Sequence, residues 1–191
     1  MNKLIFYAKK FKENDAVFSA LTGNPLSKDL KEYEGISHIL GIGENETTVL
    51  KTLSDSGKEI TSNDIVSKTN LSSNSVTSAL INLSKKKLVT KSGKTGTSNL
   101  WNSLVKLDIP SLDKLSFSLE FSEQKEEAKP IKTKVNEEEL SKAINHWYGS
   151  TEIISTETIY LPVYEAVFVS KNKKRCLRIN AFNGKVSSAD K

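Results

Sequence analysis

Residues 60–83 read ITSNDIVSKTNLSSNSVTSALINL, and this stretch decides the expected fold. Thr61 is followed at the third position by Asp64, a variant of the capping box that begins a helix. Asn70–Ser72 interrupts that short helix. Four apolar residues then recur at spacings of three and four: Val76, Ala79, Leu80 and Leu83. This spacing predicts a second helix, capped by Ser72 or Ser73, with one buried face.

The segments on either side predict a further helix and a hairpin. Thr48, Val49, Leu50 and Leu53 form a helical stripe that ends at Asp55-Ser56-Gly57. Strand character follows at residues 88–91 and 100–105, and the intervening SGKTGTSN is rich in turn formers and positive charge. Three helices followed by a hairpin are therefore expected here.

The second helix of the pair has a polar outer side. Its candidate contact residues are Ser73, at the helix start, and Asn74, Thr77, Ser78, Asn82 and Lys85, opposite the buried stripe. Such groups can enter the major groove of double-stranded DNA and hydrogen-bond there. Ile81 falls near this side, where it touches a thymine methyl or packs against a neighbouring helix. On the hairpin, Lys91, Lys94, Thr95 and Thr97 are expected beside the phosphate backbone or the minor groove.

Residues 44–105 resemble the winged-helix domains of the archaeal and bacterial MarR-like and TrmB-like regulators, in the order of their elements and in residues 60–83. The resemblance implies a helix-turn-helix DNA-binding protein that regulates transcription or associates with the chromosome. Lys87 stands where a glycine is common in these domains. A homodimer is expected, because two-fold symmetry is how small winged helices gain affinity. The alternative is an adaptor whose winged helix docks on protein.

The charge balance favours an anionic partner. Lys and Arg total 28 against 23 Asp and Glu, which gives a net charge of +5. Nearly all of these cations are lysines, which make point contacts to phosphate rather than the bidentate contacts to guanine that arginine prefers. Contact with the DNA backbone is thus better supported than a strong base code.

The remaining segments predict an α+β chain in three parts: a mainly helical winged helix-turn-helix domain with a helical extension at 1–109, a strand-like segment and charged linker at 110–134, and a small α+β domain with an antiparallel sheet at 135–191. Apolar spacings predict two short helices before Gly23 and another over Leu26–Tyr33. Residues 115–121 alternate like a strand, and Ser122–Lys134 reads as a solvated linker.

The third part begins with a capping box at Asn136 and Glu139 and a helix to Tyr148, closed by Gly149. Strands are expected at 153–158, 159–169 and 175–182, with a tight turn at Asn183-Gly184. The helix, the strands and the ending LRINAFNGKV (177–186) resemble a PepSY-type or cystatin-like module, which implies dimerisation, ligand sensing or a protein partner. Four aromatic residues line a groove or, as we prefer, belong to the core: Trp147, Tyr160, Tyr164 and Phe168.

A shorter likeness concerns LTGNPL (21–26), which resembles a segment that follows the nucleotide-binding core of archaeal winged-helix ATPases. It implies a regulatory tail related to such an ATPase. The sequence has no glycine-rich phosphate loop, so nucleotide hydrolysis by this chain is not expected.

Catalytic, metal and cofactor sites are not expected. His38 and His146 read as structural or surface groups, and Cys176 reads as a small buried hydrophobe. One cysteine and two histidines are too few ligands for a structural zinc site. With no signal peptide, no membrane span and no disulfide expected, the sequence predicts a cytoplasmic protein that is not an enzyme.

Overall fold

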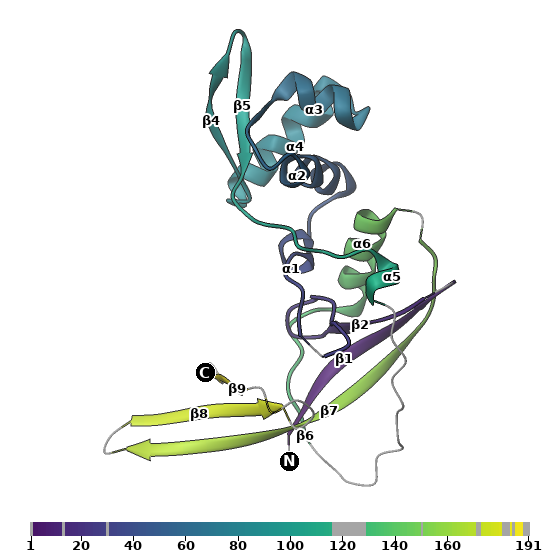
Figure 1. The fold of residues 1–191 in the computed structure, drawn as a ribbon, viewed down its shortest axis with the longest axis vertical. Helices are drawn as coiled ribbons and strands as arrows, with labels where there is room; N and C mark the ends of the chain where they lie inside the picture. Colours follow the sequence, from purple (N-terminus) through teal and green to yellow (C-terminus); the bar gives the residue numbers. More distant parts are fainter. Residues whose placement is uncertain are drawn as a thin grey trace. The chain divides into compact units, whose positions relative to one another are not determined.

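The computed structural model describes the chain at residues 2–12, 14–29, 31–115, 129–149, 151–170, 173–180, 184 and 186–188. Helices and mainly antiparallel sheets make up this part, which confirms the α+β class (Figure 1). The contacts divide the chain into two compact units. The sheet unit comprises Met1–Glu32, Ser111–Glu137 and Glu152–Lys191, and the helical unit comprises Tyr33–Pro110 and Glu138–Thr151.

The helical unit contains the helices and hairpin predicted around residues 60–83. Its elements are α1 (Ile36–Ile39), α2 (Glu44–Ser56), β3 (Ile60–Thr61), α3 (Ser62–Thr69), α4 (Ser73–Lys85), β4 (Val89–Thr95), β5 (Ser98–Ser103) and most of α6 (Glu137–Tyr148). The helix α2 packs against α3 and α4, and α3 also contacts α4. The core consists of fully buried aliphatic side chains: Ile36, Ile39, Val49, Leu50, Leu53, Ile65, Val76, Leu80 and Leu83.

Local capping signals fix where these helices begin and end. Thr61 and Asp64 form the predicted capping box, in which the Thr61 hydroxyl accepts a hydrogen bond from the Asp64 backbone N–H at 3.1 Å. Hydrogen bonds from Thr61 hold the pKa of the Asp64 carboxyl below its usual value. The Ser72 hydroxyl caps α4 by accepting from the Ser75 N–H at 3.1 Å. Gly57 ends α2 in the left-handed conformation that favours glycine.

The strands of the helical unit form a sheet in the order β3-β5-β4. The predicted hairpin is confirmed, but its first strand is longer than expected, its second strand begins and ends two residues earlier, and its turn is shorter. Thr95 pairs with Ser98, which leaves Gly96 and Thr97 in the turn. Trp101 of β5 is buried, and its indole N–H donates to the Ser62 hydroxyl at 3.1 Å. This bond fixes the base of the hairpin to α3.

Lys87 lies where the sequence comparison placed a common glycine, and its φ of 58° is left-handed. A side chain in this conformation costs about 1–2 kcal/mol, against an entropic cost for glycine of about 0.5–1 kcal/mol. Lys87→Gly is therefore expected to raise the free energy of unfolding by about 0.5–1 kcal/mol in urea denaturation. Lys85→Gly, at the end of α4, is the control and should lower it by about the same amount. Equal destabilisation by both variants would contradict this account.

The helix α6 was predicted at its observed position, but it belongs to the helical unit. Its buried side is that of the sequence prediction: Leu140, Ala143, Ile144 and Trp147. The Lys51 ammonium on α2 lies 4.7 Å from the centre of the Trp147 ring and donates to the Trp147 carbonyl at 3.3 Å. The Tyr148 hydroxyl donates to the Pro110 carbonyl at 2.8 Å, and burial raises the pKa of Tyr148. Trp147 is thus a core residue, as preferred above. The same preference was wrong for Tyr160, Tyr164 and Phe168, which lie on β7 (Ile153–Ser170) and are 48%, 58% and 56% exposed.

The sheet unit joins strands from both ends of the chain. Its elements are β1 (Asn2–Phe11), β2 (Asp15–Ser19), α5 (Leu112–Leu115), β6 (Lys129–Pro130), β7 (Ile153–Ser170), β8 (Lys173–Asn180) and β9 (Val186–Ser188). The strand order is β2-β1-β7-β8-β9, all antiparallel, and β6 pairs with β1 in parallel. The expected division at 1–109, 110–134 and 135–191 therefore differs from the two units, because β1 and β7 share one sheet.

The helices predicted for the first 33 residues were wrong. The segment forms β1 and β2, and Leu26–Tyr33 contains an isolated bridge between Leu26 and Glu32 instead of a helix. On β1, Phe6 lies in the core with Val17, Leu26 and Ile159, while the alternate residues Tyr7, Lys9 and Phe11 are also buried. Because both faces of β1 are covered, its apolar residues lack the alternation of a half-buried strand and imitate helical spacing.

Three other predictions differ from the structure or lie partly outside it. Leu115 ends the helix α5, and residues 116–121 of the expected strand lie outside the described residues. Lys129 and Pro130, expected in a solvated linker, pair with β1. Residues 153–170 form one strand rather than two. Of the expected Asn183-Gly184 turn, Asn183 is outside the described residues and Gly184 has a φ of 67°.

Lys9 is fully buried in the sheet unit. Its ammonium lies 3.0 Å from the Thr156 hydroxyl and 3.5 Å from a Glu137 carboxylate oxygen. Desolvation lowers the pKa of Lys9, and the Glu137 charge partly opposes this. The folded protein thus binds this proton less tightly than the unfolded chain does. At neutral pH the buried charge therefore lowers the free energy of unfolding by its full amount. This loss disappears as the pH rises toward 10.5, the ordinary pKa of a lysine side chain.

Lys9→Met is expected to raise the free energy of unfolding by about 1 kcal/mol at pH 7, because it removes a buried charge, while the Glu137 side chain that remains is 51% exposed and keeps its hydration. The gain should shrink as the pH approaches 10, which urea denaturation at several pH values measures. The control is Lys10→Met, because Lys10 is exposed on the adjacent position. Marked destabilisation by Lys9→Met alone would show that the ion pair stabilises the sheet unit.

Candidate nucleic-acid interface

The helix α4 has one buried and one exposed side. Its buried side consists of Val76, Ala79, Leu80 and Leu83. All six polar or basic candidates on it are exposed: Ser73, Asn74, Thr77, Ser78, Asn82 and Lys85. Ile81 lies among them and is 47% exposed, so within the described residues it is not packed into a core. The periodicity of residues 60–83 thus predicted this exposed side correctly.

Two of these candidates already hold hydrogen bonds within the helical unit. The Asn82 amide N–H donates to a Glu46 carboxylate oxygen at 3.0 Å, which joins α4 to α2. The Thr77 hydroxyl donates to the Ser73 carbonyl one turn earlier at 2.8 Å. Since a carboxylate accepts but does not donate, the Asn82 amide nitrogen faces Glu46 and its oxygen faces away. Asn82 therefore has a fixed orientation that the sequence did not suggest.

A cleft of about 270 Å³ lies between the start of α2 and the first turns of α4. Its lining residues are Asn45, Glu46, Asn74, Ser75, Ser78 and Ala79. Sequence reasoning found Asn74 and Ser78 but missed Asn45 and Glu46, because no pattern connects residues about 30 positions apart. The Glu46 carboxylate places a negative charge beside the candidate residues of α4.

The hairpin supplies four further exposed candidates: Lys91, Lys94, Thr95 and Thr97. Lys91 and Lys94 are three residues apart, a spacing that would send them to opposite faces of a regular strand. The register instead pairs Lys91 with Trp101 and Lys94 with Asn99, with an irregularity between Lys91 and Gly93. This bulge adds one residue to β4, so both lysines lie on the same face of the hairpin. The strand β4 also contacts α4.

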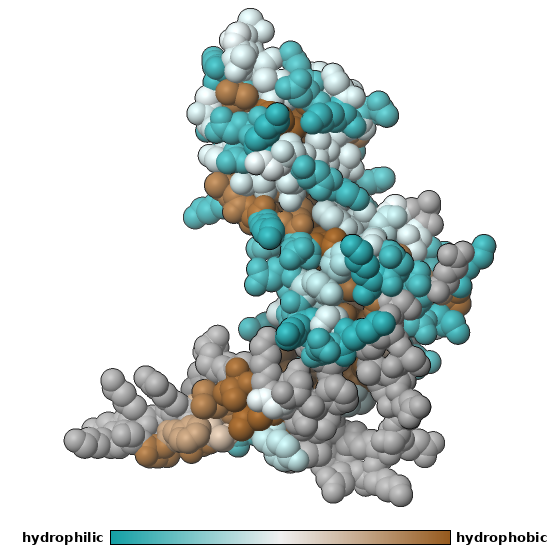
Figure 2. Space-filling model, viewed as in Figure 1, coloured by the Kyte–Doolittle hydropathy of each residue, from teal (hydrophilic) through white to brown (hydrophobic). Residues whose placement is uncertain are grey.

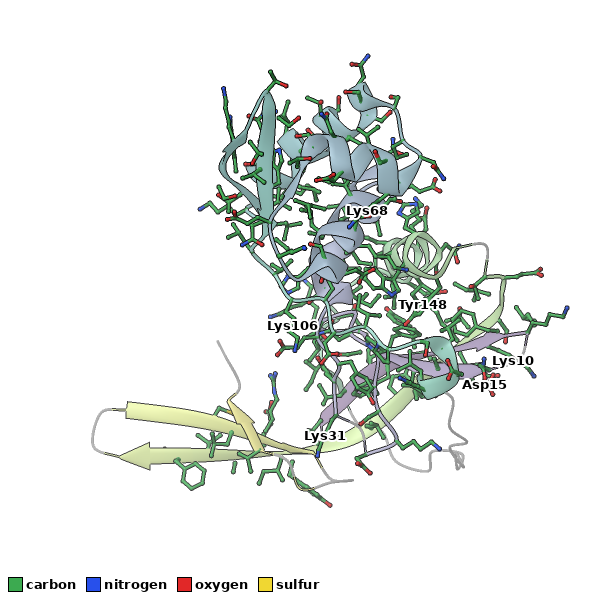
Figure 3. The ribbon with its side chains drawn as sticks, turned by 45° about the horizontal axis from the view of Figure 1, so that its top comes forward. Lys10, Asp15, Lys31, Lys68, Lys106 and Tyr148 are labelled. Atoms are coloured by element: carbon green, nitrogen blue, oxygen red, sulfur yellow. The ribbon has the colours of Figure 1, made fainter. Side chains whose placement is uncertain are left out.

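Residues 85–94 contain five lysines and no carboxylate, whereas the helical unit as a whole has ten lysines and nine carboxylates. Residues 36–107 contain nine lysines, five carboxylates and no arginine. Lys68 on α3, labelled in Figure 3, is exposed like Lys85 and Lys87. The Lys86 ammonium is bound to the Gly41 carbonyl at 2.6 Å. Figure 2 shows hydrophilic residues over much of this unit. The arrangement favours contact with a polyanion through separate ammonium groups.

The remaining candidates for chemistry do not form a cluster in the structure. No group of three His, Cys, Asp or Glu residues that could hold a metal ion occurs among the described residues. His146 lies on α6, where its Nδ1 is buried without a hydrogen-bond partner in the described part. His38 lies in the last turn of α1 and is half-buried. Cys176 is a partly buried residue of β8. Within the described ranges, no helix has the length and hydropathy to cross a membrane.

Comparison with known proteins gives no relative for this chain. No protein-family model matches it, no curated protein matches its sequence, and no solved structure matches its fold.

Proposed function

We propose that residues 44–103 are a winged helix-turn-helix that binds double-stranded DNA, as part of a transcriptional regulator or chromosome-associated protein. In this proposal α3 and α4 are the helix-turn-helix, α4 enters the major groove, and the β4–β5 hairpin is the wing. The observation that carries it is the exposed polar side of α4 next to a hairpin with two lysines on one face. Small polar side chains on such a helix can hydrogen-bond to base edges.

The charges support binding dominated by the DNA backbone. Lysine ammonium groups neutralise phosphates one at a time, and each neutralised phosphate releases condensed counterions. The Glu46 carboxylate, which accepts a hydrogen bond from Asn82, lines the cleft beside Asn74 and Ser78 and therefore opposes phosphate at the first turns of α4. The proposed phosphate contacts are for this reason Lys85 at the end of α4 and the two lysines of the wing. We propose that the protein acts as a homodimer, so that two such modules contact one duplex.

A salt titration tests DNA binding. If Lys85, Lys91 and Lys94 each contact one phosphate, the logarithm of the association constant should fall linearly with the logarithm of salt concentration, with a slope near −3 per protomer. Fluorescence anisotropy of a labelled duplex of mixed sequence measures this. Failure to bind duplex even at low salt would contradict the proposal.

A second candidate function is docking on another protein. The exposed Ile81 at the centre of α4 and the Glu46 carboxylate in the neighbouring cleft favour it, because an apolar group ringed by polar ones is typical of protein interfaces. Binding of that kind would show a weak dependence on salt, which separates it from contact with phosphates.

A further inference from the structure

Asn82 on α4 is oriented by a residue of another helix. Its amide N–H donates to a carboxylate oxygen of Glu46 on α2 at 3.0 Å; Asn82 is exposed and Glu46 is half-buried. An unconstrained asparagine can rotate its carboxamide and present either its donor or its acceptor to a ligand. Glu46 removes this choice, because a carboxylate accepts hydrogen bonds and so attracts the amide nitrogen. The Asn82 carboxamide oxygen is therefore directed away from Glu46.

The Glu46 carboxylate in turn lies close against Gly43, the residue that precedes α2. A Cβ atom added at Gly43 would lie 2.7 Å from the second carboxylate oxygen of Glu46, which is closer than such atoms approach. The φ of Gly43 is −79°, an ordinary value, so this contact uses its small size and not its backbone freedom. Any larger residue at position 43 would displace the carboxylate that holds Asn82.

The surroundings of this pair favour a hydrogen-bond donor as ligand and oppose an acceptor. Glu46 also lines the cleft beside Asn74 and Ser78, and no lysine or arginine is among the described residues of that lining. In the major groove, cytosine presents only a donor, the amino group on C4. Adenine presents the acceptor N7 beside its amino group, and guanine presents two acceptors. A negative charge at this place therefore opposes adenine and guanine but not cytosine.

We propose that Glu46 is a positioning residue through which Asn82 selects cytosine. This inference rests on the proposed function, because it requires α4 to lie in the major groove. An unconstrained asparagine commonly binds adenine with two hydrogen bonds, donating to N7 and accepting from the amino group. With its nitrogen held by Glu46, Asn82 keeps the acceptor half of this pairing and loses the donor half. An acceptor alone matches the amino group of cytosine.

The test uses the full chain and a pool of randomised duplexes, from which the best binders are selected and sequenced. The selected duplex should contain a cytosine whose replacement by adenine weakens wild-type binding roughly tenfold, within the usual range for one wrong base pair. Glu46→Ala should abolish or reverse this preference for cytosine, because Asn82 is then free to bind adenine. Its salt slope should equal that of the wild type, since no phosphate contact is lost.

Two further variants separate positioning by Glu46 from direct contact with the base. Asn82→Ala should lose the same preference, and adding Glu46→Ala to it should cause no further loss, because Glu46 acts through Asn82. Gly43→Ala keeps the carboxylate but displaces it, so it should also reduce the preference. Glu44→Ala is the control, since it removes the same charge from an exposed residue of α2 and should keep the preference of the wild type.

Several outcomes would overturn the role of Glu46. They are a wild type that selects no cytosine, a Glu46→Ala or Gly43→Ala variant with the full wild-type preference, and a Glu44→Ala variant that loses the preference as Glu46→Ala does. Circular dichroism verifies that each variant is folded. In each of these cases duplex binding with an unchanged salt slope would leave the winged helix proposal standing, whereas a wild type that binds no duplex would overturn both.

Discussion

Replacement of Leu80 with alanine is expected to lower the free energy of unfolding by about 2–5 kcal/mol. Leu80 is 1% exposed and lies on the side of α4 that packs against α2 and α3. Removing three carbons there loses the free energy that is gained when they move from water into the core. It also leaves a cavity that the surrounding helices fill incompletely. Urea denaturation followed by circular dichroism measures the loss.

The matched control for this experiment is the next residue along the helix. Ile81 is an aliphatic side chain of the same size, but it is 47% exposed on the opposite side of α4. Ile81→Ala should change the free energy of unfolding by less than about 1 kcal/mol, because the Ile81 side chain buries little apolar surface when the protein folds. Similar losses in the two variants would mean that the buried side of α4 has been assigned wrongly.

The helical unit was predictable because its signals are local. The capping box at Thr61 and Asp64, the cap at Ser72 and the stripe from Val76 to Leu83 each lie within one helix or beside it. Such signals act over three or four residues and can be read directly from a sequence. The exposed side of α4 followed from the same periodicity.

The sheet unit was not predictable in this way. Its central pairing joins Phe6 to Ile159, and no local pattern indicates which distant segments share a sheet. Lys9 contributed to the wrong prediction of helices in the first 33 residues, because a charged residue at a buried position interrupts the apolar residues of β1. Burial of Lys9 depends on Thr156 and Glu137, which are more than 120 residues away in the chain.

Part of the candidate interface also depended on non-local geometry. The sequence identified Lys91 and Lys94, but it is the bulge between Lys91 and Gly93 that sets both on one face. The orientation of Asn82 likewise depends on Glu46, which lies 36 positions earlier. Neither contact can be predicted from residue propensities, because both depend on packing between elements that are distant in the sequence.

The double variant Lys91→Ala with Lys94→Ala is expected to weaken binding to every duplex alike, by roughly 30-fold at moderate salt. Each lost contact between an ammonium group and a phosphate is worth about 1 kcal/mol in a high dielectric, and about 1.4 kcal/mol corresponds to a tenfold change. The magnitude of the salt slope should fall by about 2, because two fewer counterions are released. Anisotropy titrations of several duplexes at a series of salt concentrations measure both quantities.

A control variant shows whether weaker duplex binding comes from the loss of specific phosphate contacts or from the lower net charge of the protein. Lys28→Ala with Lys31→Ala removes the same charge from exposed lysines of the sheet unit, of which Lys31 is labelled in Figure 3. It should leave the salt slope nearly unchanged, because long-range effects of exposed charges are screened within about 10 Å at 0.1 M salt. If this control weakens binding as much as the hairpin variant does, the protein attracts DNA through its overall charge. If neither variant has an effect, the wing does not contact DNA. A loss confined to the hairpin variant, together with altered sequence preference in Asn74→Ala, would assign phosphate contact to β4 and base contact to α4.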